Sequence, residues 1–310
     1  MHSHLIHRDM WSDKFWDITL DAYSKSYKIP KEALMKTMMP EIANANADAL
    51  VKAMEKAGID KALTMGVDWG MSVVGEAKWS VEEFNKWVAD QVAEYPGTLY
   101  ALCAVDPRRG EKAVNLLEKS VTEWGMKGLK FHPTAGYYPD DQKYFPLYEK
   151  CVELNVPLYS HTAVTITAPM ESKFADPIYL DSVAAKFPDL KIVMVHFGSI
   201  TWPYKCHEIM GIRPNVYAEI SGYQAQAVGT PKRMLEFLRG VFDTPGLGTS
   251  IVDKIMWGTD WPLLELILTD EKWVDWVKNI PEKAQEYGMR FKQREIKKIL
   301  GLNAEKFLKL

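Results

Sequence analysis

The feature that most constrains the fold is the repeated pairing of a short apolar segment with a longer amphipathic one. The segment 192–196 is almost wholly apolar, carries β-branched residues at alternate positions and is soon followed by Gly198, as is typical of a buried strand. Its only polar residue, His196, stands at the carboxyl end. Seven similar segments complete a set of eight predicted strands: 1–6, 61–67, 99–105, 127–132, 156–161, 191–196, 215–221 and 254–260.

Amphipathic helical segments separate these predicted strands. Local boundary signals support them: Gly58 follows the first helix as a C-cap, and Ser80 with Glu83 forms a capping box at the start of the second. Strict alternation of strands and helices predicts a parallel sheet, and eight units predict closure into a (β/α)8 TIM barrel. The helices expected between strands are 47–57, 80–95, 110–124, 142–154, 176–187, 203–211 and 231–240.

The chain of 310 residues shows no linker or repeat that would divide it, so we expect a single barrel domain over 1–310. A long, aromatic-rich segment at 7–46 separates the first strand from its helix. A loop of this length is usually functional, so we expect a cap or lid; a hydrophobic plug over the barrel mouth is an equal alternative. The tail 263–310 is expected to add helices at 271–279, 282–287, 293–300 and 304–308.

Composition narrows the class of partner. The formal net charge is −3 and no basic run is present, which argues against binding to nucleic acid. The three cysteines are widely spaced and form no Cys-x-x-Cys pair, which is typical of reduced thiols in a cytoplasmic protein. We find no signal peptide and no apolar run long enough to span a membrane, so we expect no membrane association.

Metal-binding residue types stand at the predicted strand ends. His2 and His4 form a His-x-His pair, and residues two apart on a strand point to the same face. His161 and Asp260 would complete a set of three nitrogens and one carboxylate, which suits zinc and tolerates manganese or iron. His196 is left as a non-ligand acid or base beside the metal.

Each of these residues has a structural alternative. His2-Ser3-His4 at the start of the chain is also compatible with a tag remnant or a frayed end. Asp260 is also a suitable helix N-cap within Gly-Thr-Asp-Trp-Pro. A single histidine at a strand end is more often a hydrogen-bonded core residue than a ligand. Four histidines at strand ends, together with Asp260 at another, favour a metal or catalytic site.

Further residues are expected to line the substrate pocket. Lys130 shares a strand face with His132, so it is expected in the barrel mouth as a polar wall residue. Alternatives for Lys130 are a carboxylated bridge between two metals or a pairing with Glu219. Arg8 is a candidate clamp for a substrate carboxylate, although an exposed surface role is equally compatible. Aromatic residues at strand-end loops suggest a planar, unsaturated substrate, and the ones we assign to the pocket are Trp69, Tyr137 and Trp261.

At these motifs the chain resembles the amidohydrolase superfamily, and within it the branch of aminocarboxymuconate-semialdehyde and resorcylate-type decarboxylases. The resemblance runs through the whole chain, on His2-Ser3-His4, on 128–133, on His161, on 196–198, on 257–262 and on the closing segment 299–304. It implies a barrel in which His2, His4, His161 and Asp260 hold one divalent ion. It also implies that His196 and Asp260 serve catalysis, and that a homodimer is common.

The expected activity is therefore metal-dependent chemistry on a small carboxylic acid, with zinc favoured and manganese as the alternative. Non-oxidative decarboxylation of an unsaturated or aromatic acid is favoured over hydrolysis of a C–O or C–N bond. A non-catalytic barrel that serves as a binding subunit is the third hypothesis. Only Met1 precedes His2, whereas the family usually has a longer first strand. Two alternatives follow: the natural start lies upstream, or the first strand is short and its metal ligands stand on a frayed end.

Overall fold

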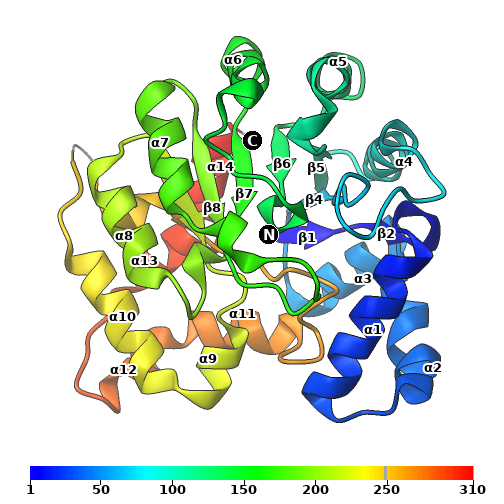
Figure 1. Ribbon diagram of the computed structural model, residues 1–310. Helices are drawn as coiled ribbons and strands as arrows, with labels where there is room; N and C mark the ends of the chain where they lie inside the picture. The colour runs from blue at the N-terminus through cyan, green and yellow to red at the C-terminus, as the bar shows by residue number, and fades with distance from the viewer. Residues whose placement is uncertain (248–249, 310) are drawn as a thin grey trace.

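A computed structural model describes residues 1–247 and 250–309 and confirms the eight predicted strands as one parallel sheet. The strands follow one another around the sheet in chain order, so each strand pairs with the next one in the sequence (Figure 1). They are β1 (His2–His4), β4 (Ala62–Met65), β5 (Leu99–Ala104), β6 (Leu129–Phe131), β7 (Leu158–His161), β8 (Ile192–Val195), β9 (Val216–Glu219) and β10 (Ile255–Met256).

The barrel closes between its first strand and the segment that follows its last. The His2 carbonyl accepts the N–H groups of Thr259 and Asp260 at 3.2 and 3.1 Å. The His4 N–H donates to the Trp261 carbonyl at 2.7 Å, and Ser3 forms a parallel bridge with Trp261. These bonds join the two strand ends that carry His4 and Asp260. The hydrogen bonds that close the barrel therefore also bring the two site residues together.

Helices surround the sheet close to their predicted positions. Those that connect consecutive strands are α3 (Ala47–Ala57), α4 (Val81–Ala93), α5 (Glu111–Thr122), α6 (Phe145–Glu153), α7 (Ile178–Lys186), α8 (Pro203–Ile212), α9 (Gln224–Gly229) and α10 (Pro231–Asp243). The tail forms α11 (Asp270–Lys278), α12 (Ile280–Gln285), α13 (Gln293–Lys297), a π-helical turn at Lys298–Leu302 and α14 (Asn303–Leu308). Within the described residues, no helix is both long and apolar enough to cross a bilayer.

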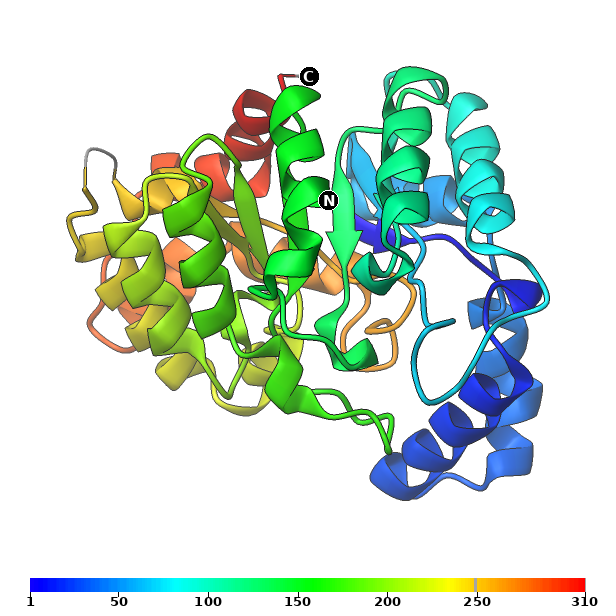
Figure 2. The same ribbon diagram turned by 45° about the horizontal axis from the view of Figure 1, so that its top comes forward.

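The long segment 7–46 is ordered as two helices rather than as an irregular loop. It contains α1 (Asp13–Tyr27) and α2 (Lys31–Ile42), and it is enclosed by a short antiparallel pair, β2 (Ile6–His7) with β3 (Asn44–Ala45). In Figure 2 the two helices stand out beyond the end of the barrel toward which the strand arrows point. We call α1 and α2 the cap; its position at the catalytic end of a barrel is consistent with the predicted lid.

Trp273 anchors the last strand of the barrel from outside. Its side chain on α11 is fully buried, and its Nε1–H donates to the Gly258 carbonyl at 2.9 Å. Gly258 lies two residues before Asp260, so this contact fixes the backbone that delivers the aspartate. Trp276 lies on the same helix but is only partly buried.

Replacement of Trp273 by alanine is expected to reduce the free energy of unfolding by about 3–5 kcal/mol, because it leaves a large cavity. Denaturant titration monitored by circular dichroism measures this. Trp276→Ala is the control and is expected to cost clearly less. A Trp273→Ala protein with wild-type stability would contradict this description of the core.

Candidate metal centre and active site

Three of the four predicted metal ligands converge at the carboxyl ends of the strands. One ligand atom each from His2, His4 and Asp260 lies within 4.8 Å of the others, and all three side chains are buried. The Asp260 Oδ1 atom is 3.1 Å from His4 Nε2 and 3.8 Å from His2 Nε2. We call these three residues the metal cluster.

The second nitrogen of each histidine ring is already committed to an acceptor. His4 Nδ1 lies 3.1 Å from the Met65 carbonyl, and His2 Nδ1 lies 3.2 Å from Glu219 Oε1. Both Nδ1 atoms must therefore carry the proton, so in the neutral rings both Nε2 atoms present a lone pair to the carboxylate of Asp260.

This arrangement fits a bound cation. Within the described residues the buried His2 Nε2 atom has no hydrogen-bond partner. Two lone pairs beside a carboxylate oxygen repel one another unless a cation lies between them. Metal-binding histidines usually donate their other N–H to a carboxylate or a backbone carbonyl, as both do here.

Glu219 and Ser221 organise the histidines, and the sequence did not assign either of them to the site. Besides His2, the Glu219 carboxylate accepts the backbone N–H groups of His196 and Ser221, each at 2.8 Å, and the Ser221 hydroxyl at 2.7 Å. The sequence does hold a signal for the pair: Glu219 and Ser221 are two apart at a strand end, as His2 and His4 are, and so share a face.

His196 is held in one tautomer by this network. Its Nδ1 lies 2.8 Å from the Ser221 hydroxyl, which itself donates to Glu219. His196 therefore donates from Nδ1, and its Nε2 is left to take or give a proton. Its ring centroid is 5.7 Å from that of His2.

Two of the predicted catalytic residues have left-handed backbones. His196 has φ 70° and Asp260 has φ 60°, and Phe197 and Ser199 are also positive at 43° and 46°. Such conformations are costly for residues with a side chain and persist where the surrounding structure holds them, often at functional sites.

The charges in the site are set by burial and by one another. Burial lowers the pKa of His2 to about 4, against the opposing effect of Glu219. Burial would raise the pKa of Glu219, but His2 and His196 bring it down to about 2. The pKa of Asp260 is likewise below its ordinary range because His196, His4 and His2 outweigh burial. The site therefore combines ionised carboxylates with a neutral His2, as metal binding requires.

His161, the fourth predicted ligand, lies close to the metal cluster but is not part of it. Its Nε2 is 2.9 Å from the Ala163 carbonyl, and it does not join the set of ligand atoms within 4.8 Å. Its ring stacks on His132 with centroids 3.9 Å apart and meets His196 edge-on at 4.7 Å. To serve as a ligand through Nε2, His161 would have to give up its bond to Ala163.

Lys130 lies within the barrel, as expected for a wall residue. Its side chain is buried, and burial lowers its pKa to about 8 although Asp260 and Glu219 oppose this shift. Within the described residues, no carboxylate oxygen lies within 4.0 Å of the Lys130 Nζ atom, the distance that an ion pair requires. The alternative of a direct pairing with Glu219 is therefore not realised in this structure.

The remaining predicted substrate residues lie in three places. Trp69 packs on His132 with centroids 4.4 Å apart, and the Tyr137 hydroxyl accepts the His132 N–H at 3.0 Å. Trp261 is buried at the barrel seam. Arg8 is partly exposed; the contacts found for it are an ion pair with Asp13 and packing over Trp16, both in the cap region.

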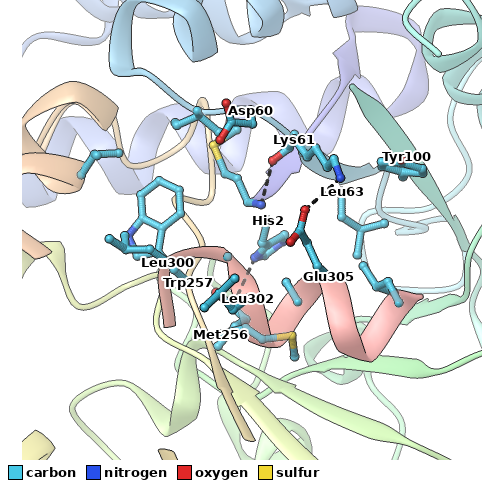
Figure 3. A pocket seen from close by; sticks show the side chains of 18 of the residues that line it. His2, Asp60, Lys61, Leu63, Tyr100, Met256, Trp257, Leu300, Leu302 and Glu305 are labelled. Carbon is cyan, nitrogen blue, oxygen red and sulfur yellow. Dashed lines mark hydrogen bonds and ion pairs between the residues drawn. The ribbon is translucent and has the colours of Figure 1, made fainter. Parts of the chain in front are cut away.

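A separate cavity of about 430 Å³ opens at the opposite end of the barrel (Figure 3). It is lined by the first residues of several strands and by the chain near α14, and Lys61 pairs with Glu305 at 2.9 Å on its wall. His2 and Glu219 border it, but His4, His196 and Asp260 do not. Most of the predicted site residues therefore lie outside this cavity.

The amidohydrolase family model matches residues 1–310, which is the whole chain. The chain belongs to the amidohydrolase family. This confirms the family resemblance and the barrel that it implied.

One curated protein is similar to part of this chain. A 2-keto-4-carboxy-3-hexenedioate hydratase from Sphingobium sp. (strain NBRC 103272 / SYK-6) is 28% identical over 148 residues, which are 41% of this chain and 43% of that protein. This chain thus matches less than half the length of that curated relative.

Two solved structures share the fold. A 5-carboxyvanillate decarboxylase from Novosphingobium aromaticivorans, complexed with manganese and 4-hydroxy-3-methoxy-5-nitrobenzoic acid, has a TM-score of 0.66 at 19% identity and covers 100% of this chain and 95% of its own. A probable 2-pyrone-4,6-dicarboxylic acid hydrolase from Acinetobacter baumannii, with citric acid bound, has a TM-score of 0.63 at 16% identity. The match covers 100% of this chain and 98% of the hydrolase. At these identities the likeness establishes the fold alone.

Glu219→Gln is expected to weaken metal binding by about 10–100-fold, because it removes the carboxylate that orients His2. Titration with zinc, followed by calorimetry, measures this. Glu295→Gln is the matched control: Glu295 is also buried and hydrogen-bonded, to Arg239, but lies outside the site. Equal zinc affinity in the wild type and Glu219→Gln would contradict the role of Glu219.

Proposed function

We propose that this amidohydrolase is a metal-dependent enzyme that acts on a small carboxylic acid. The observation that carries the proposal is the metal cluster. His2 and His4 turn their Nε2 atoms toward Asp260, and each ring is fixed by an acceptor at Nδ1. A barrel used only for binding has no need of such an arrangement, so we place the non-catalytic alternative last.

The residues have separate roles in this proposal. His2, His4 and Asp260 would hold the ion, with His161 as the fourth ligand that the family resemblance implies. A divalent ion bound there would act as a Lewis acid toward a substrate carboxylate and a neighbouring oxygen. His196 would transfer the proton, because its Nδ1 is held by Ser221 and its Nε2 remains available.

Decarboxylation is the reaction that we favour. When the bond to the departing CO₂ breaks, its electron pair stays on the substrate carbon, which must then take a proton. We assign this proton to His196 rather than Asp260, because His4 lies 3.1 Å from Asp260 and the pKa of Asp260 is below its ordinary range. The step requires that His196 first take a proton at Nε2 from solvent, because burial lowers its pKa and its other proton stays on Nδ1 beside Ser221. The Nε2 proton then moves to the substrate carbon and leaves His196 neutral. The similar decarboxylase, which has this fold, is complexed with a nitrobenzoic acid. This supports an aromatic or unsaturated acid as the substrate.

Hydrolysis of a lactone, ester or amide is the second candidate, supported by the similar fold of the pyrone hydrolase. Lys130 distinguishes the two reactions. A carboxylated Lys130 that bridges two ions would favour hydrolysis. A free Lys130 amine beside one ion favours decarboxylation.

Other features complete the proposal. We favour zinc, because two imidazoles and one carboxylate suit it, and we hold manganese as the alternative because the similar decarboxylase contains it. We also propose a cytoplasmic protein, on its three buried, unpaired cysteines, and a homodimer that binds no nucleic acid.

The test incubates the metal-loaded protein with hydroxybenzoates, muconate-type acids, lactones and amides. We expect CO₂ release from at least one acid. His196→Gln is expected to keep the metal and lose about 10²–10⁴-fold in rate, as for a general acid or base. Turnover of a lactone or amide with no CO₂ from any acid would refute decarboxylation. A His196→Gln protein with full activity would refute the role of His196.

A further inference from the structure

Trp69 lies between the cap and the histidines of the site. Its indole stacks on Phe15 of α1 with ring centroids 5.4 Å apart, and it also packs on His132 with centroids 4.4 Å apart. His132 in turn stacks on His161. An unbroken series of ring contacts therefore leads from the cap, through Trp69, to the site.

The polar atom of this indole has no partner. Trp69 is 7% exposed, and within the described residues its buried Nε1–H meets no hydrogen-bond acceptor. Leaving a buried donor unpaired costs free energy, and native proteins rarely do so without a water or a ligand to accept the bond. Only the His132 ring separates this indole from His161. An N–H group beside the site is suited to donate to an oxygen atom of a bound substrate.

A second observation shows that the loop which carries Trp69 is rigidly held. The Asp68 carboxylate accepts Nε–H and Nη2–H of Arg109 at 2.7 and 2.9 Å. The same guanidinium donates to both carboxylate oxygens of Glu76 at 3.0 Å. Asp68 and Glu76 stand on either side of Trp69 in the sequence, so Arg109 fastens both ends of one loop.

The loop backbone passes directly against this clamp. A Cβ atom added to Gly70 would lie 2.1 Å from Glu76 Oε2 and 2.4 Å from Arg109 Nη2, so a larger residue beside Trp69 would displace the ends of these two side chains. Asp68 also accepts the Gly70 N–H at 3.0 Å. With both acids bound, Arg109 is committed to the loop and is not the group that binds the substrate.

We propose that Trp69 is a specificity-determining residue whose indole N–H donates to an oxygen of the substrate, and that Arg109 is its positioning residue. This inference rests on the proposed function and adds the substrate class. The substrate is an acid that carries a second oxygen acceptor, a carboxylate or hydroxyl group, away from the carboxylate at the metal. That position follows from the contacts of Trp69, which are with His132 and Phe15 and not with the metal cluster.

The test compares isophthalate with benzoate, which lacks the second acceptor, on zinc-loaded protein labelled with ¹⁵N in its indoles. We expect isophthalate to bind about tenfold more tightly, as for one good hydrogen bond. We also expect it to shift one indole cross-peak, identified as Trp69 by its loss in Trp69→Phe. Trp69→Phe should bring the two affinities within about twofold, because an aromatic ring remains in place but the pyrrole ring with its N–H donor is lost.

Arg109→Gln tests the positioning role, and Arg239→Gln is its matched control. Arg239 also joins two acids, Asp243 and Glu295, but outside the site. We expect Arg109→Gln to move or broaden the Trp69 cross-peak of the free protein and to reduce the preference for isophthalate. Arg239→Gln should leave both unchanged, whatever either substitution does to the melting temperature.

Equal affinities for the two acids in the wild type, failure of both to bind, or an unmoved Trp69 cross-peak would overturn the assignment. An Arg109→Gln protein with an unchanged Trp69 cross-peak would overturn the positioning role. Zinc content and CO₂ release test the proposed function separately. A protein that binds zinc and releases CO₂ but does not prefer isophthalate would refute only the role of Trp69.

Discussion

The carboxylate of Glu219 is the group on which the site depends. It stands at the end of β9 and accepts hydrogen bonds from His2 on β1, from the His196 backbone after β8 and from Ser221. One buried anion thus ties together strands from both halves of the chain. Each bond has a chemical consequence: it fixes the proton of His2, the left-handed backbone of His196 and, through Ser221, the tautomer of His196.

Barrel closure depends on the same strand ends. The carbonyl of His2 accepts two N–H groups of the segment that carries Asp260, while the His2 ring faces the Asp260 carboxylate. The backbone therefore positions the metal cluster. The cap is connected to this centre through Trp69, whose loop is fastened to the barrel by Arg109. Stability and chemistry share the same residues at this end of the molecule.

The sequence predicted the strands well, because they follow from local pattern. It also placed His2, His4 and Asp260 together, as the structure does, while their binding of an ion stays a prediction. Short, largely apolar segments define the strands, and the carboxyl ends of parallel strands gather in one place, which brings His4 and Asp260 together. The two cap helices were not predicted. The feature noted in the segment 7–46 was its many aromatic residues, which do not specify a helix. In addition, α2 contains Pro40, and proline is unfavourable inside a helix.

The orientation of His161 was beyond prediction, since its bond to the Ala163 carbonyl depends on the conformation of the loop that follows it. Glu219 was considered only as a partner for Lys130, because a buried acid on a strand does not by itself show which histidine it will meet.

The central claim is that His2, His4 and Asp260 hold one catalytic ion. Anomalous X-ray diffraction at the zinc edge, from crystals of the zinc-loaded protein, tests it most directly. The account predicts one strong peak within about 2.0–2.2 Å of His2 Nε2, His4 Nε2 and an oxygen of Asp260. An ion bound elsewhere in the barrel, or no peak at these three residues in a protein that retains zinc, would contradict it.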